Sequence, residues 1–543
     1  MKKIKTLVSL LAIGLVLTSC ERYLDVNENP NNVHQENLTP KLVFPGAVTQ
    51  TYRTQAVSML QFGNVMMNSW AGNTYAYGGP FADEYTLSSV NSSFYDEIWD
   101  GLYVNIANFS FIENYPNANH SQDYYIAAAK IMKAYYMQYL VDLYGDVPYS
   151  EAFKGQANLT PKYDDDVAIY KSLIADMDTA KSLITSGGTN GAIAMGATDI
   201  VFQGTMANWT ALANSIKLRL LLRMSNVTGD LATYRNQQLA TLAASSVTFI
   251  GSDVFEKPGY AGTSDAALNP MVASLFTDAA GSSPQNYSLI TASENLATAL
   301  NGNNYSLPDA AYQKFNGIVD PRRNRLFLPV SYNGATVVRG VRQGATPGQP
   351  GAPNDSNVVS TISPFYVGAN STAAATIIAQ GNPRGGLLMS AAELNLLRAE
   401  AALRYPTIFS TWNAQTFFNN AVTLSGPTMS GGAALSMTGY QTLIASRPGL
   451  GWIGTDAQKL EAIMTQKWIL LTQYNPTEMY IEYNRVQQQY PYSPMATTSI
   501  RANKPWRLIY PTSEYVGNSA NVPNISSSEA FTKNAKTPFW NQN

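Results

Sequence analysis

Cys20 is the only cysteine among the 543 residues, and it ends the sequence Leu17-Thr18-Ser19-Cys20. Residues 2–5 carry three lysines, and residues 7–17 form a short apolar run that ends at Leu17, the first residue of this sequence. A basic region, a short apolar region and small residues in that order are typical of a secretory signal. Because the final segment has the form of a bacterial lipobox, we predict a signal peptide over residues 1–19 and a diacylglyceryl thioether on Cys20. An uncleaved N-terminal anchor and a secreted chain with a free thiol are the alternatives.

The sequence contains few residues in the arrangements that are typical of a catalytic site. The two histidines, His34 and His120, are far apart, so no Ser-His or Cys-His pair and no histidine-rich metal cluster can be recognised. Three adjacent aspartates at 164–166 are compatible with calcium binding, but they lack the Gly-containing, alternating loop of a calcium motif. We favour a helix start for them, where acids meet free N–H groups. We therefore expect no catalytic residue, no metal and no cofactor, although a hydrolase using two carboxylates stays an alternative.

A Gly-rich segment between residues 71 and 93 is predicted to be a long loop, and it is dense in aromatic and polar side chains. Exposed rings with nearby amides and carboxylates suit a ligand with apolar faces and hydroxyl groups. The alternative is that the rings fold back onto the body as a small core. The candidate ligand-binding residues in and beside the loop are Trp70, Asn73, Tyr75, Tyr77, Phe81 and Asp83.

Composition limits the class of protein. Charged residues make up only 13% of the chain and the net charge is −2, which argues against a nucleic-acid binder, since such a protein needs a basic face. No segment after the signal has the length and apolarity of a membrane span. Residues 20–40 are rich in turn formers and predict an extended lipidated leader, followed by one domain over 41–543.

Helical periodicity dominates the body, and the predicted fold class is mainly α. Apolar residues recur at three- and four-residue steps in the longest predicted helices, while strand-like alternation is rare. Helix-turn-helix pairs are expected, although no residue signature recurs at a fixed interval. The predicted helices cover residues 94–111, 123–144, 167–183, 206–224, 390–404, 411–423 and 456–474, with a further helical stretch from Pro40 to about Val65.

Several segments, taken together and in order, resemble the SusD/RagB family of Bacteroidetes outer-membrane nutrient-binding lipoproteins. The segments are Tyr23–Asn31 after the lipobox, with the Asn-Pro-Asn element of one branch; Ala128–Lys133 through Val141–Tyr149, with its Tyr-Gly-Asp-Val-Pro-Tyr turn; Met389–Leu394 and Leu397–Ala401; Gln466–Ile469 with Glu478–Tyr480; and Arg507–Glu514.

This resemblance implies a scaffold of tetratricopeptide-like helical hairpins with a loop-rich part that binds the ligand. It also implies a nutrient-binding lipoprotein on the cell surface, held to the outer membrane by its lipid, which is not an enzyme. The implied ligand is an oligosaccharide or a peptide, and the implied partner is a SusC-like TonB-dependent transporter. A structural or adhesion lipoprotein is the remaining alternative.

The motif residues themselves fit a structural role better than a ligand role. Charged side chains on core-facing helices must be paired, so we expect ion pairs and packing contacts from Glu393, Arg398, Glu400, Lys467 and Trp468. The ligand-contacting residues are then expected elsewhere in the chain.

Overall fold

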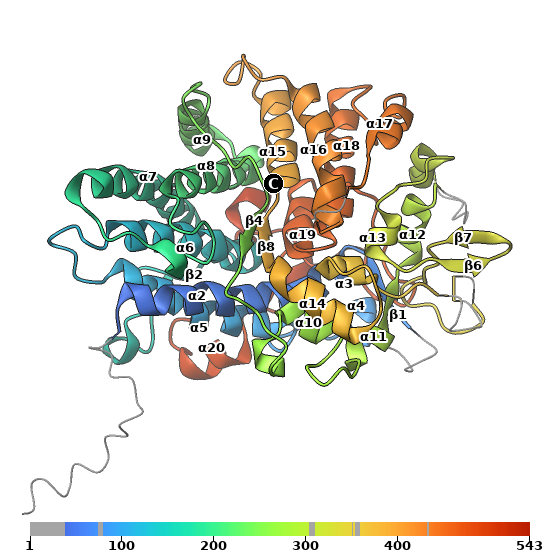
Figure 1. Ribbon diagram of the computed structural model, residues 1–543, viewed down its shortest axis with the longest axis horizontal. Helices are drawn as coiled ribbons and strands as arrows, with labels where there is room; N and C mark the ends of the chain where they lie inside the picture. The colour runs from blue at the N-terminus through green and yellow to red at the C-terminus, as the bar shows by residue number, and fades with distance from the viewer. Residues whose placement is uncertain are drawn as a thin grey trace, which may run out of the picture.

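A computed structural model describes residues 38–73, 80–302, 310–349, 351–352, 359–431 and 434–542 (Figure 1). The predictions for the signal peptide, for Cys20 and for most of the leader lie outside these residues, as do those for Tyr75 and Tyr77.

The described chain is mainly helical, as predicted. Short strands and single helical turns connect the helices. The helices of the N-terminal half are α2 (Pro40–Thr54), α3 (Leu60–Met66), α4 (Ala82–Thr86), α5 (Asp96–Glu113), α6 (Asp123–Tyr144), α7 (Asp166–Asn190), α8 (Met206–Arg223) and α9 (Gly229–Leu242). The later helices are α10 (Pro270–Leu275), α11 (Gln285–Leu289), α12 (Glu294–Leu300), α13 (Arg323–Leu326), α14 (Ala374–Arg384), α15 (Ala391–Arg404), α16 (Ala414–Met429), α17 (Thr438–Ile444), α18 (Asp456–Leu471), α19 (Pro476–Arg485) and α20 (Thr512–Gly517).

Consecutive helices pack against each other in the manner of helical hairpins. In the N-terminal half α5 packs on α6, α6 on α7 and α7 on α8, and in the C-terminal half α15 packs on both α16 and α18. Figure 1 shows the first set at one end of the molecule and the second set beside it, with α19 below the second set. One hydrophobic core runs through both sets, from Phe44 in α2 to Trp540 near the C-terminus.

Helix α6 lies at the centre of the N-terminal set and shows how the sequence specifies an element. It covers the predicted range Asp123–Tyr144, and almost all of its side chains are buried. It ends at Gly145, whose φ of 77° is a conformation that glycine adopts without strain. Helix α7 begins where the aspartates end, because the Asp165 carboxylate accepts a hydrogen bond from Ala168 N at 2.9 Å.

Among the described residues the strands form four two-stranded antiparallel pairs, two of which connect distant parts of the chain. The pairs are β1 (Trp70–Gly72) with β5 (Ile290–Ala292), β2 (Val147–Pro148) with β3 (Tyr163–Asp164), β4 (Val254–Glu256) with β8 (Gly386–Met389), and β6 (Val330–Tyr332) with β7 (Ala335–Val337). In the first pair Trp70 lies opposite Ala292, which attaches the middle of the chain to the N-terminal helices. The predicted loop over 71–93 therefore contains part of a strand and a short helix, α4.

Most of the charged motif residues form buried ion pairs, as predicted. Glu393 pairs with Arg219 at 3.2 Å, and Glu400 pairs with Arg485 at 2.7 Å. Lys467 Nζ lies 2.7 Å from a Glu482 oxygen. The neighbouring Trp468 is buried, and its indole N–H donates to Ser69 Oγ at 2.8 Å. These contacts join α15 and α18 to the N-terminal half of the chain and to α19.

Arg398 makes the expected packing contacts but forms no ion pair among the described residues. Its guanidinium carbon Cζ lies over the ring of Phe417 at 3.8 Å from the centroid. Aromatic packing replaces the acid because the segments beside α15 supply rings at this position, among them Trp412, 4.6 Å away.

No helix among the described residues combines the length and the apolarity needed to cross a membrane.

Candidate functional site

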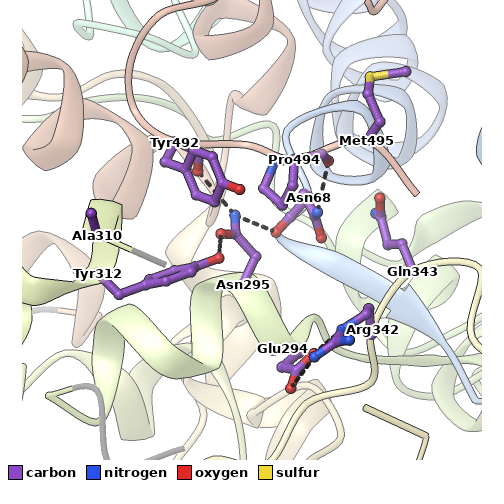
Figure 2. Close-up of a pocket in the computed structure, with 10 residues that line it drawn as sticks. All are labelled: Asn68, Glu294, Asn295, Ala310, Tyr312, Arg342, Gln343, Tyr492, Pro494 and Met495. Atoms are coloured by element: carbon purple, nitrogen blue, oxygen red, sulfur yellow. Dashed lines mark hydrogen bonds and ion pairs between the residues drawn. The ribbon is translucent and has the colours of Figure 1, made fainter. Parts of the chain in front are cut away.

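A cavity of about 420 Å³ opens where the loop-rich middle of the chain meets the C-terminal segment. Figure 2 shows its lining residues, which come from five separate parts of the sequence. They are Asn68, Glu294, Asn295, Ala310, Tyr312, Arg342, Gln343, Tyr492, Pro494 and Met495.

Local structure places each of these side chains. Asn68 follows α3 with a φ of 52°, a left-handed conformation that asparagine tolerates better than most residues. Glu294 and Asn295 form the first turn of α12, where the Ser293 hydroxyl caps the helix through Leu296 N. Tyr312 lies in a 3₁₀ turn over Ala310–Phe315. The remaining residues follow β7 or belong to the irregular segment after α19.

Amide and hydroxyl groups form one hydrogen-bonded network across the cavity wall. The Asn295 amide donates to Asn68 O at 3.3 Å and to Tyr492 O at 3.2 Å, and its oxygen accepts from the Tyr312 hydroxyl. The Asn68 amide donates to Pro494 O at 3.1 Å. These bonds fasten four chain segments to one another, so the cavity wall is held in place before a ligand arrives.

Aromatic and charged groups complete the wall. Tyr312 and Tyr492 meet edge to face, with ring centroids 5.5 Å apart, and the Tyr492 ring remains half-exposed. Arg342 forms a two-point ion pair with Glu294 through distances of 2.6 Å and 3.2 Å, so its charge is compensated within the wall. The Gln343 amide donates to Trp70 O at 2.8 Å, which links the cavity to β1.

The chemistry of this cavity is recognition by hydrogen bonds and ring contacts. Glu294 is the only carboxylate among the lining residues that the structure describes, and Arg342 occupies both of its oxygens. Glycoside hydrolysis by paired acids needs two carboxylates across a cleft, and this wall offers one. The half-exposed Tyr492 ring, with amides beside it, gives both an apolar face and polar partners.

The profile of the SusD-like family, described as starch-binding and associating with the outer membrane, matches residues 30–511. The chain belongs to this SusD-like family. No curated protein matches the sequence.

Solved structures of SusD homologues share the fold. A chitin-binding SusD homologue from Flavobacterium johnsoniae is 21% identical, with 88% of this chain and 94% of that chain covered and a TM-score of 0.64. A SusD homologue from Bacteroides uniformis is 19% identical, with 92% and 99% covered and a TM-score of 0.66. A SusD-like protein from Bacteroides thetaiotaomicron is 22% identical, with 89% and 94% covered and a TM-score of 0.62.

The SusD-like fold places the predicted ligand residues in three different environments. Trp70 is fully buried and its indole N–H donates to the Tyr366 hydroxyl at 3.1 Å, so its ring faces the core rather than solvent. The prediction of an exposed ring is wrong for Trp70, because β1 pairs with β5 and turns this side chain inward. Asn73 is also buried, and its amide donates to Ser288 O at 3.2 Å.

Phe81 and Asp83 lie near α4, outside the cavity of Figure 2. The Phe81 ring is half-buried and contacts Tyr85 edge to face at 6.2 Å. Asp83 is exposed and lines another cavity, of about 550 Å³, together with Glu84, Tyr95 and Glu97. Burial raises the pKa of Glu84, and its oxygen accepts from the Tyr95 hydroxyl at 2.7 Å.

Sequence reasoning missed the residues that line the cavity, above all Asn295, Tyr312 and Tyr492. They lie in the middle third and the C-terminal segment, where Gly, Pro and Asn interrupt any periodicity. The only usable signal was the aromatic content after Gln487, which the sequence shows but does not connect to α12.

The acidic group at the start of α7 has a structural explanation. Asp146, Asp165 and Asp166 offer oxygens within 4.8 Å of one another. Each has a backbone partner: Asp165 caps α7, Asp146 accepts from Asp166 N at 3.0 Å, and Asp166 accepts from Phe539 N at 2.8 Å. Burial raises the pKa of Asp166 to about 7. These contacts support a helix start, as favoured from the sequence.

Proposed function

We propose that this chain is a cell-surface lipoprotein that binds a nutrient oligosaccharide in the cavity of Figure 2 and delivers it to a SusC-like TonB-dependent transporter. The network of Asn68, Asn295 and Tyr312 beneath the half-exposed Tyr492 ring is the observation that carries the proposal. Membership of a family described as starch-binding supports a saccharide ligand, as does the chitin-binding homologue with the same fold.

The wall suits a neutral sugar for physical reasons. A pyranose ring has apolar C–H faces that stack on tyrosine and hydroxyl edges that need amide or carboxylate partners. The side chains of Asn295 and Asn68 are already held by hydrogen bonds to backbone carbonyls. They therefore lose little conformational entropy when a ligand binds. The Glu294–Arg342 pair leaves the wall without net charge, which favours a neutral ligand over a charged peptide.

The proposed role involves no bond cleavage by the chain itself. The lipid on Cys20 would hold the protein at the outer membrane, while the leader over residues 20–40 would keep the helical body next to its transporter. Replacing Cys20 with alanine should prevent lipidation and the cut before residue 20, as measured by the intact mass of the chain. Retention of the lipid mass in that variant would contradict the lipidation site.

Binding can be tested by calorimetric titration of the mature chain with malto-oligosaccharides, chito-oligosaccharides and a peptide digest, with product analysis of each mixture. We expect at least one saccharide series to bind without being cleaved. Tyr492→Ala should weaken that binding about tenfold or more, since a ring contact with a sugar contributes on the order of 1–2 kcal/mol. The matched control is Tyr234→Ala, which truncates a half-exposed tyrosine on α9 and should leave the affinity unchanged.

Three outcomes would contradict the proposal. Cleavage products would show an enzyme, and binding of peptides alone would exclude a saccharide ligand. Equal affinities in the two tyrosine variants would exclude this cavity as the site. The transporter is tested separately by co-purification with the TonB-dependent barrel expressed together with the chain, and absence of a complex would remove the delivery step.

A further inference from the structure

A second concave region lies on either side of β4. This strand runs through the middle of the molecule (Figure 1). Two cavities of about 360 Å³ and 670 Å³ share the lining residues Gly251, Ser252, Asp253, Phe255 and Lys257, so they adjoin across this segment. We call them together the β4 groove. None of its lining residues lines the cavity of Figure 2.

The β4 groove carries an excess of positive charge. Lys257 Nζ and Arg384 Cζ lie 5.3 Å and 5.9 Å from the centroid of the Phe255 ring. Neither cation forms an ion pair within the described part of the chain. Asp253 is the single carboxylate among the described lining residues, and its Oδ1 already accepts from Ala391 N at 2.9 Å. Two cations therefore face one acid.

Arg384 has a donor left over. Its Nη1 donates to Tyr366 O and its Nη2 to Thr428 O, both at 2.7 Å, which fixes the guanidinium between the 3₁₀ turn Pro364–Val367 and α16. Its Nε is buried and has no hydrogen-bond partner in the described structure. Burial lowers the pKa of Arg384, and the nearby Tyr52 and Asp253 offset this only in part. A buried donor without a partner costs free energy that an anionic acceptor would recover.

A third cation lies next to the smaller cavity. Arg398 Cζ is 5.3 Å from the ring centroid of Phe249, which lines that cavity, and Arg398 Nε also has no hydrogen-bond partner. Burial lowers the pKa of Arg398 to about 10. The buried arginines of the core differ from it, since Arg219 and Arg485 both pair with glutamates.

We propose that the β4 groove is a second saccharide site, which binds oligosaccharides that carry carboxylate groups, such as uronic acid chains. Lys257 and Arg384 supply charge-assisted hydrogen bonds to carboxylates, and the half-buried Phe255 supplies a ring between them. Amides of Gln203 and Gln380 line the two ends and suit the hydroxyl groups of a chain several units long. This site stands independently of the proposed function, because it uses other residues and another ligand charge.

The test compares two oligosaccharides that differ mainly in charge. The mature protein is titrated with tetragalacturonate and with its methyl-esterified form, at low and at high salt. We expect the acid to bind at least about tenfold more tightly than the ester, because a hydrogen bond to a charged group contributes on the order of 1.5–3 kcal/mol. We also expect this advantage to shrink in high salt. Equal affinity for acid and ester, or no binding of either, would overturn the proposal.

Variants test whether the β4 groove is where the acidic oligosaccharide binds. Lys257→Gln and Arg398→Gln should each weaken tetragalacturonate binding several-fold, whereas Lys154→Gln, which removes another exposed lysine, should not. Arg384→Gln should weaken it further, and its unfolding midpoint is measured because its carbonyl contacts are lost as well. Tyr492→Ala should leave the affinity for tetragalacturonate unchanged. A loss of affinity in this variant would show that the acidic oligosaccharide binds in the cavity of Figure 2, which would overturn the proposal. Inorganic sulfate competing at equal concentration would also overturn it, since the site would then recognise any anion.

Discussion

Arg485 and Glu400 form a two-point ion pair inside the fold, with Nη1–Oε1 at 2.7 Å and Nη2–Oε2 at 2.9 Å. Both side chains are fully buried, so the pair connects α19 to α15 where no water can replace either partner. Arg485→Met should lower the free energy of unfolding by about 3–5 kcal/mol, because it leaves the Glu400 charge buried with fewer partners. Denaturant unfolding measures this loss.

Arg404→Met is the matched control for this pair. Arg404 contacts the same carboxylate at 2.7 Å, but its side chain is 25% exposed. The expected cost is at most about 1 kcal/mol, as for other solvent-accessible pairs. Equal costs for the two variants would show that burial does not decide the contribution of these arginines.

Acid should weaken the same contact. Burial by itself would raise the pKa of Glu400, but the charges of Arg485, Arg404 and Lys467 lower it to about 2. A carboxylate whose pKa is lowered by folding stabilises the fold above its unfolded pKa, and this contribution is lost as the pH falls from about 4.5 toward 2. Part of the acid sensitivity of the chain should therefore disappear in Glu400→Gln.

Glu256 should have the opposite effect on the pH dependence of stability. It is fully buried on β4, where burial raises its pKa to about 8, and one oxygen accepts from the Tyr260 hydroxyl at 2.9 Å. Between pH 4.5 and 8 the folded chain keeps this proton and the unfolded chain releases it, so stability falls as pH rises. The slope from this group is about 1.4 kcal/mol per pH unit.

Glu256→Gln should remove that slope. The free energy of unfolding is measured at pH 5 and at pH 8 for the variant and for the wild type. The variant should gain stability relative to the wild type as the pH rises from 5 to 8. Glu97→Gln changes an exposed acid on α5 and serves as the control, for which the two differences should be equal. Parallel curves for wild type and Glu256→Gln would show that the buried acid is not protonated in the fold.

Lys504, next to the wall of the cavity in Figure 2, provides a third test of how buried charged groups make stability depend on pH. It is buried, and burial lowers its pKa to about 7; its ammonium group donates to Ser493 Oγ, which precedes the cavity residue Pro494. Between pH 7 and 10.5 the unfolded chain binds the proton and the folded chain does not, so stability rises with pH in this range.

Lys504→Met should lose this rise. Relative to the wild type the variant should be most stable near pH 6, and its advantage should decline by about 1.4 kcal/mol per pH unit above pH 7. Thermal unfolding at pH 6, 8 and 10 measures the trend. A difference that does not change with pH would show that Lys504 stays charged in the fold.

The sequence predicts the helical scaffold well because local signals and tertiary packing agree there. Helix α6 has the predicted bounds, since its apolar period and Gly145 point to the same end. Helix α16 instead continues to Met429 through Gly426 and Pro427, residues that end a helix in isolation. Packing of Val422 and Ser425 in the core decides its length, and such contacts cannot be recognised from the local sequence.

The candidate site was much less predictable. Its residues meet only after β1 has paired with β5 and the C-terminal segment has folded onto α12, and neither contact has a local signal. The same pairing turns Trp70 into the core, whereas the sequence left open whether this ring is exposed or folded back onto the body. The aromatic partners of Arg398 could not be named from the sequence for a related reason, because Phe249 and Phe417 lie on other segments of the chain.

Trp70 and Tyr492 allow the contribution of folding to be separated from that of binding. Trp70→Phe keeps most of the buried ring and removes the indole donor to Tyr366, so unfolding free energy should fall by about 1–3 kcal/mol while saccharide affinity stays constant. Tyr492→Ala should show the reverse, with a small loss of stability and a tenfold or larger loss of affinity. Both variants are measured by denaturant unfolding and by the same titration. A Trp70→Phe variant that kept its stability but lost affinity would mean that the ligand reaches β1, as first expected from the sequence.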